Sequence, residues 1–255
     1  MFKNLIRHSL RSFKRQRSYI LINIFGLSVG IACSLLIALF VLNEASYDRY
    51  NVKKDRIYRL VLNGKIGGQE IIGAYTCAAI GPTMLREVPE VEDYLRLNPR
   101  GPTVVEYEDQ TFTEDHLVEA DSTFFNFFTI PLIKGDPSSV LNQPGRAVVS
   151  ESTAKRMFGD KDPIDKAIRI GNDTARFIIS GIIADIPGNS HFEANILTSF
   201  MTNPRSRDPI WLSNSYSTYL LFKPNTSYTT VQDKIPALLE KYVGPEVQQI
   251  GRAHV

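Results

Sequence analysis

The 255-residue sequence has little of what enzymes and metalloproteins require. Only two cysteines and four histidines are present. The sequence contains no G-x-x-x-x-G-K-[ST], G-x-S-x-G, H-E-x-x-H or C-x-x-C pattern. The common sequence motifs for phosphate binding, hydrolysis, zinc binding and redox chemistry are therefore absent. We therefore expect no catalytic residue, no cofactor and no metal site, and we predict that the chain is not an enzyme.

The two cysteines are not expected to form a disulfide. Cys33 lies inside the longest apolar run of the sequence, and Cys77 lies far outside it. A bond between them would have to join two opposite environments. Both are better interpreted as small hydrophobic side chains.

Acidic residues are missing from the first 17 positions. Of the 29 lysines and arginines, six lie there, which leaves 23 basic against 27 acidic side chains in the rest. Nucleic acid is therefore not a predicted partner of the chain as a whole. The six basic residues are Lys3, Arg7, Arg11, Lys14, Arg15 and Arg17, and we expect them to form a basic face on the cytoplasmic side of a membrane.

A long apolar run follows the basic segment. Of the 24 residues from Tyr19 to Leu42, fifteen are Leu, Ile, Val or Phe, and none is charged. A helix of this length extends roughly 36 Å, enough to cross a hydrocarbon core of about 30 Å. A cleaved signal peptide is the competing interpretation, but its apolar region is shorter, about 7–15 residues. We predict a transmembrane helix at residues 18–43.

One face of this predicted helix carries small residues. Gly26, Gly30 and Ser34 follow the small-x-x-x-small spacing that allows two membrane helices to pack closely. Glycine is also simply common in membrane helices, and the sequence leaves both interpretations open.

Residues 1–17 alternate apolar and basic positions at helical spacing. This pattern predicts a basic amphipathic helix that rests on an anionic membrane surface, so membrane lipid is a predicted partner. Basic residues also follow the apolar run, but Glu44 and Asp48 come first on that side. We expect the N-terminus to lie in the cytoplasm and residues 44–249 on the far side of the membrane.

Residues 44–249 read as an α+β fold, a mixed α/β domain with two subdomains. Short helices are expected from Gly81-Pro82 to Val88 and from Ser150, as the N-cap, to Gly159. Asp121 is expected to cap a third helix, whose phenylalanines we interpret as core residues. A final helix is predicted at 229–242, interrupted near Pro236, and residues 203–209 are predicted to form a loop. The predicted strands are 57–62 with a turn at Asn63-Gly64, 103–107 with 112–118, 147–149, 167–170 with 177–183, and 217–222.

His191 and Glu193 form the one constellation that suggests a site. On a strand they would share a face, but no second histidine lies near them in sequence. Such short matches are weak, so we interpret the pair as a turn residue and a solvated carboxylate.

The order of several motifs resembles the MacB/FtsX-type ABC transporter permeases, specifically their N-terminal helix and MacB-like periplasmic core domain. E-A-S-Y-D-R-Y at 44–50 and D-I-P-G-N-S-H at 185–191 are two of these motifs. The others lie at 23–32, 55–59, 120–125, 135–137, 150–154, 158–159 and 162–164.

The resemblance implies a function and partners. Permeases of this type work as a homodimer or pseudo-dimer with a separate cytoplasmic ABC ATPase in the bacterial inner membrane. ATP hydrolysis moves the periplasmic domains, which serves export, lipoprotein extraction or mechanotransmission. In this scheme residues 44–249 are the moving periplasmic part.

The sequence departs from this family because further membrane helices are not present. Residues 250–255 read like translated adapter sequence, so we expect a truncated chain with a non-native tail. Two alternatives remain: a single-pass membrane-anchored periplasmic binding or sensor module, and an anchored hydrolase whose nucleophile and base are not found.

Overall fold

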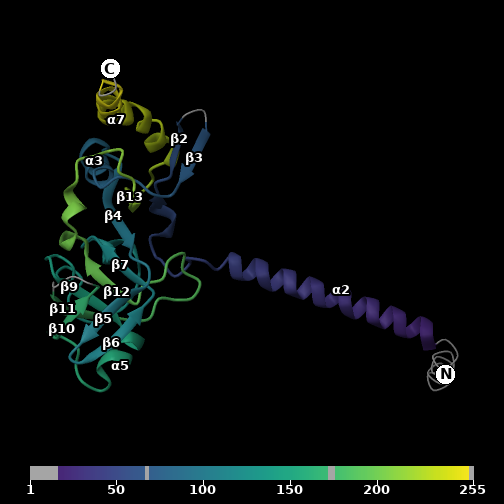
Figure 1. Cartoon of the computed structure of the whole chain (residues 1–255). Coiled ribbons are helices and arrows are strands. Elements are labelled where there is room, and N and C mark those ends of the chain that lie inside the picture. Colours follow the sequence, from purple (N-terminus) through teal and green to yellow (C-terminus); the bar gives the residue numbers. More distant parts are fainter. Residues whose placement is uncertain (1–16, 67–68, 172–175, 253–255) are drawn as a thin grey trace. The chain divides into compact units, whose positions relative to one another are not determined.

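The computed structural model describes residues 17–66, 69–171 and 176–252. Contacts divide the chain into two units, residues 1–47 and 48–255 (Figure 1). In the first unit, α2 (Arg17–Glu44) extends one residue beyond each end of the span predicted at 18–43. None of its residues is buried.

The second unit is built on a sheet of eleven strands. The order is β1-β13-β4-β7-β12-β9-β11-β10-β5-β6, and β8 pairs with one end of β11. β9 pairs in parallel with β11 and β7 in parallel with β12, while the other pairings are antiparallel. The α+β prediction is confirmed, and one continuous sheet of eleven strands runs through the domain for which we predicted two subdomains.

Most strands of this sheet have three to six residues, whereas β4 has nine and β11 has eight. Their bounds are β1 (Ile57–Arg59), β4 (Val91–Pro99), β5 (Thr103–Tyr107), β6 (Gln110–Glu114), β7 (Leu117–Ala120), β8 (Leu132–Lys134), β9 (Arg146–Ser150), β10 (Ala167–Ile170), β11 (Arg176–Ile183), β12 (Ile196–Ser199) and β13 (Ser217–Phe222). A separate hairpin joins β2 (Leu62–Ile66) and β3 (Gln69–Gly73).

Helices cover the sheet at both of its ends. In Figure 1, α3, α7 and the β2–β3 hairpin gather at one end of this unit, and α5, β5 and β6 gather at the other. The helices are α3 (Ile80–Glu87), α4 (Phe124–Phe127), α5 (Glu151–Phe158), α6 (Tyr228–Gln232) and α7 (Ile235–Arg252), with 3-10 turns η1 (Lys54–Arg56), η2 (Phe200–Thr202) and η3 (Pro204–Arg207).

The hydrophobic core consists of clusters that lie between the sheet and its helices. One cluster surrounds the three phenylalanines Phe124, Phe127 and Phe128, as predicted, and a second lies under α5. A third cluster packs α3 and α7 onto β13.

Several local predictions are confirmed. Ser150 accepts a hydrogen bond from the backbone N–H of Thr153 at the start of α5, and Gly159 ends that helix with a φ of 60° that favours glycine. β13 has the predicted bounds, and the final helix is broken between α6 and α7, just before Pro236.

Three local predictions are wrong. Asn63 and Gly64 lie inside β2 and not in a turn, because pairing with Ile72 and Ile71 of β3 outweighs the local turn preference. The predicted strand 112–118 is split, since β6 pairs with β5 whereas β7 pairs with β4 and β12. The side chain of Asp121 does not cap α4, because it binds an arginine instead.

Candidate functional site

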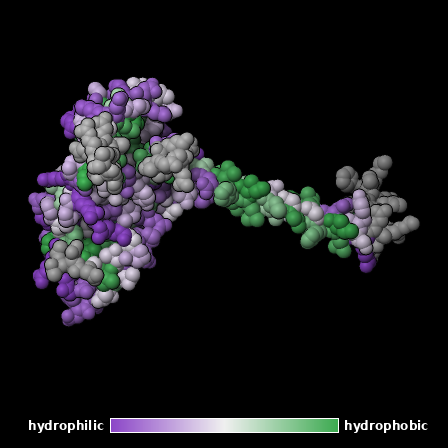
Figure 2. Space-filling view, turned by 45° about the horizontal axis from the view of Figure 1, so that its top comes forward, coloured by the Kyte–Doolittle hydropathy of each residue, from purple (hydrophilic) through white to green (hydrophobic). Residues whose placement is uncertain are grey.

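The residues predicted to span a membrane all lie on α2. Tyr19, Gly26, Gly30, Ser34 and Leu42 are on one continuous helix, and the described residues contain this one helix that is long and apolar enough for a span. Figure 2 shows hydrophobic side chains along it. The membrane span itself stays a prediction.

The small residues of α2 leave open space beside the helix. Nothing lies within 4 Å of a Cβ added at Gly26 or Gly30. The hydroxyl of Ser34 donates to the carbonyl oxygen of Gly30 at 2.8 Å, so its polar group is satisfied within the helix. Among the residues that the structure describes, none packs against Gly26 or Gly30 on the predicted packing face.

The predicted basic face cannot be compared with the structure in full. Arg17 is the first residue of α2. The other five basic residues, and the amphipathic helix predicted at 1–17, lie outside the described residues: Lys3, Arg7, Arg11, Lys14 and Arg15.

Two distant motifs meet in what we call the junction, residues 48–51 with the loop 189–191 and Tyr219. The backbone N–H of Asp48 donates to the carbonyl oxygen of Asn189 at 2.9 Å. The Asp48 carboxylate lies 2.8 Å from Nδ1 of His191 and accepts from the backbone N–H of His191 at 3.2 Å. The hydroxyls of Tyr50 and Ser190 lie 2.8 Å apart. These bonds fasten the segment that follows α2 in sequence to the loop 189–191.

His191 connects this segment to the sheet. Its Nε2 lies 2.8 Å from the hydroxyl of Tyr219 on β13. A carboxylate only accepts hydrogen bonds, so Nδ1 carries a proton toward Asp48, and in the neutral ring Nε2 accepts from Tyr219. Burial raises the pKa of Tyr219 to about 12, so that its hydroxyl keeps its proton at physiological pH.

The next residues of the same segment are also fixed. Asn51 is buried, and its side-chain oxygen accepts from the backbone N–H of Thr129 at 2.9 Å. The hydroxyl of Thr129 in turn accepts from the backbone N–H of Val52 at 3.0 Å. Arg56 pairs with Glu92 at 2.7 Å. Residues 48–56 are therefore bonded to the domain along their length.

His191 lies in a bend, as its interpretation as a turn residue requires, but its side chain also joins two distant segments. His191 lies between Asp48 and Tyr219, two residues that are 143 and 28 positions away in sequence. Glu193 instead pairs with His116, at 2.8 Å and with both side chains exposed. The sequence signal was the motif at 185–191, but its partner could be identified only from the fold.

These groups do not assemble a metal site. Among the described residues, no cluster of three or more His, Cys, Asp or Glu side chains is placed to hold a metal ion. Asp48, His191 and Tyr219 are instead satisfied by one another. The junction is thus a structural connection between elements.

Comparison with known families supports the motif order found in the sequence. A sequence model of the MacB-like periplasmic core domain matches residues 20–238, which is most of the chain. The chain belongs to the MacB-like periplasmic core domain family. This family supplies the periplasmic domain of MacB/FtsX-like ABC permeases, which are transporter components and not classical enzymes.

Solved structures show the same fold for this MacB-like domain. A domain from Porphyromonas gingivalis, whose parent protein is assigned as a permease, shares 23% identity with a TM-score of 0.69, covering 76% of this chain and 84% of its own. The periplasmic region of MacB from Actinobacillus actinomycetemcomitans gives 15% identity and a TM-score of 0.54, covering 74% and 85%. The extracellular domain of the ABC-type transporter YknZ from Gram-positive bacteria gives 12% and 0.53, covering 74% and 93%. No curated protein gives a significant match.

A buried ion pair in the MacB-like domain is not evident from the sequence. Arg96 on β4 donates to both carboxylate oxygens of Asp121 at 2.8 Å, and to the carbonyl oxygens of Ala78 and Ser206. The Arg96 guanidinium also lies 4.4 Å from the ring centre of Phe200. Arg96 is one of three charged residues in β4, so the sequence does not single it out, and its four partners come from three distant segments.

Proposed function

We propose that the chain is the N-terminal part of a permease subunit of an ABC transporter. In this proposal α2 crosses the bacterial inner membrane, the N-terminus is cytoplasmic, and residues 44–249 are periplasmic. The family assignment supports it, together with a 28-residue apolar helix without a buried residue. A separate cytoplasmic ATPase subunit supplies the energy, and two permeases work as a homodimer or pseudo-dimer.

The observation that carries this proposal is the junction. A permease must pass movement of its membrane helix to the domain beyond the membrane, and a flexible linker would absorb that movement. Here Asp48, four residues after α2 ends, is bonded through its backbone and its side chain to the loop 189–191. Through His191 the connection continues to β13.

In this proposal the chain transmits movement from the membrane helix to the periplasmic domain, and it catalyses no reaction. Closure of the ATPase would displace α2, and residues 48–56 would move the domain as one unit. This motion would serve export, lipoprotein extraction or the control of a periplasmic partner.

Cysteine labelling tests the orientation. In a background that carries Cys33→Ala and Cys77→Ala, Asp109→Cys in the exposed turn between β5 and β6 should react with a membrane-impermeant maleimide in intact spheroplasts. Ser12→Cys, in the basic segment before the predicted span, should react only after lysis. The opposite labelling pattern would reverse the orientation, and equal labelling of both would exclude a membrane span.

The gene beyond Gln249 tests the permease assignment separately. Sequencing the intact gene from its source should reveal three or more further apolar stretches of about 20 residues. A stop codon after Val255 would leave no transport path and would favour the membrane-anchored binding module.

A further inference from the structure

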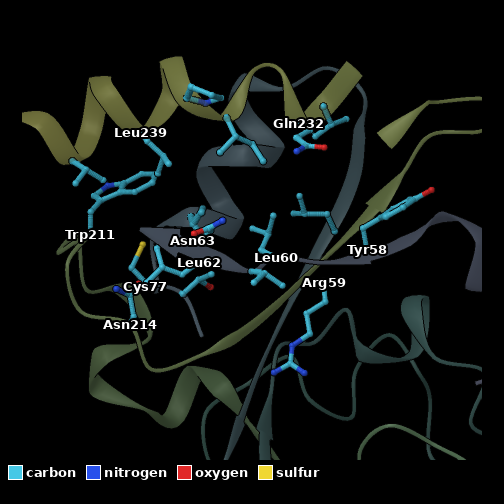
Figure 3. Close-up of a pocket in the computed structure, with 18 of the residues that line it drawn as sticks. Tyr58, Arg59, Leu60, Leu62, Asn63, Cys77, Trp211, Asn214, Gln232 and Leu239 are labelled. Carbon is cyan, nitrogen blue, oxygen red and sulfur yellow. The ribbon is translucent and has the colours of Figure 1, made fainter. Parts of the chain in front are cut away.

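An apolar cleft lies between the end of the sheet and the helices α6 and α7. Its volume is about 610 Å³, within the range of about 300–1,000 Å³ that is typical of small-molecule sites. In Figure 3, Leu239 of α7 and Gln232 of α6 lie across the cleft from Leu60 and Leu62. Trp211, the one tryptophan of the chain, also lines it.

The walls of the cleft carry little charge. Of the described residues that line it, Arg59 alone is charged. Figure 3 shows Arg59 extending away from the other labelled side chains, and its guanidinium donates to Ser217 at 2.8 Å and to the carbonyl oxygen of Ala74 at 3.1 Å. An ion that entered the cleft would therefore lose its hydration without gaining a partner, which favours a neutral occupant.

Aromatic rings and side-chain amides at the cleft indicate which kind of ligand it would bind. Trp211 stacks on Tyr242 with ring centres 4.8 Å apart, and Tyr58 stacks on Phe222 at 4.5 Å. Both pairs place planar rings at the cleft, where an aromatic ligand would find favourable contacts. The side-chain amides of Asn63 and Gln232 lie at the same cleft and offer hydrogen bonds.

We propose that this cleft binds a neutral, mostly apolar small molecule that carries an aromatic ring and a hydrogen-bonding group. Several apolar side chains of the cleft, including Leu60, Leu62, Ile235 and Leu239, are only half-buried, so their remaining apolar surface faces the space that the ligand would fill. Binding requires neither the ATPase nor a particular membrane orientation. Its failure would therefore leave the permease proposal untouched.

Benzophenone, a neutral aromatic ketone, is a suitable probe because light attaches it to nearby C–H groups. The 255-residue chain in lipid nanodiscs would be irradiated with increasing benzophenone, and the labelled peptides would be mapped by mass spectrometry. We expect saturable labelling of peptides that line the cleft. Labelling of α2 serves as an internal measure of the probe dissolved in lipid, which does not saturate.

Matched variants test whether the probe binds in the cleft. Leu239→Glu should lower cleft labelling by about tenfold, because it places a charge in the apolar wall. Ile133→Glu, at an exposed apolar position on β8, should leave labelling unchanged. Leu60→Phe reduces the space without adding charge, so it should also lower labelling, and Gln232→Leu should lower it by about threefold through the lost hydrogen bond.

Three outcomes would overturn the proposal. One is labelling of the cleft that does not saturate. Another is equal cleft labelling of Leu60→Phe and Ile133→Glu, provided that both variants are as stable as the wild type in urea denaturation. The third is cleft labelling that disappears in the full-length permease, which would mean that the protein's own chain fills the cleft.

Discussion

Arg96 and Asp121 illustrate at the residue scale how one buried charge pair organises a large part of the domain. Their side chains are 7% and 11% exposed, and the arginine reaches the backbone of two further segments. Removal of one partner leaves the other charge buried and uncompensated.

We therefore expect Asp121→Ala to lower the free energy of unfolding by about 3–5 kcal/mol in urea denaturation. Asp55→Ala is the matched control, because Asp55 pairs with Lys54 but is 83% exposed, and its loss should change stability by less than about 1 kcal/mol. Equal effects of the two substitutions would show that the buried pair does not stabilise the domain.

Tyr219 predicts a pH dependence of stability at the same scale. Its folded pKa of about 12 lies above the ordinary value of 10.0 because the hydroxyl is buried. Because the folded pKa is raised, the contribution of the protonated Tyr219 hydroxyl to the free energy of unfolding is fully present below pH 10. This contribution is lost as the pH rises from 10 to 12. Two pKa units correspond to a loss of about 2–3 kcal/mol.

The comparison of wild type with Tyr219→Phe isolates this effect from the other tyrosines and lysines that titrate in the same range. In urea titrations between pH 9 and 12, the wild type should lose more stability than the variant. Parallel curves for the two proteins would show that Tyr219 does not ionise with the predicted raised pKa.

At the scale of elements, the start of α5 contains one satisfied and one unsatisfied hydroxyl. Ser150 caps the helix, whereas the buried hydroxyl of Thr153 has no hydrogen-bond partner among the described residues. Ser150→Ala should lower the free energy of unfolding by about 1 kcal/mol. Thr153→Val keeps the shape and removes a buried polar group, so it should be neutral or stabilising. Thermal unfolding would measure both, and destabilisation by Thr153→Val would indicate a partner for its hydroxyl.

The helix α2 carries a prediction about association. If Gly26 and Gly30 pack against a second membrane helix, Gly30→Leu should lower the association constant by about tenfold, or about 1.4 kcal/mol. Energy transfer between labelled chains in vesicles would measure this. Ser28→Leu, on the other side of the helix, is the control. Equal association of the two variants would favour the interpretation that these glycines have no packing role.

At the scale of the whole molecule, the division into two units predicts where the chain can be cut. The four core clusters lie entirely within residues 48–255, and none of the described residues of α2 is buried. A chain of residues 44–255 should therefore fold cooperatively in water.

A second truncation tests the junction. A chain of residues 57–255 lacks Asp48, Tyr50, Asn51 and Arg56, and should lose more than about 2 kcal/mol of stability, because several hydrogen bonds and the buried Asn51 side chain are removed. Urea denaturation of the two chains gives the difference. Equal midpoints would mean that the segment after α2 is a passive linker, which would remove the main support for the proposed transmission.

The sequence by itself determined the features that depend on neighbouring residues. The apolar run that forms α2, the cap at Ser150, the end of α5 at Gly159 and the bounds of β13 all follow from local propensity and periodicity. The order of motifs was also sufficient to identify the family.

Only the tertiary structure decided which distant residues meet. Asp48 with His191, Arg96 with Asp121, and the walls of the apolar cleft come from segments far apart in the chain. Sequence patterns report the burial of a strand face, but they do not report which strand lies beside it. The same limit explains why Asn63 and Gly64 are extended, since a partner strand supplied more free energy than the turn they favour locally.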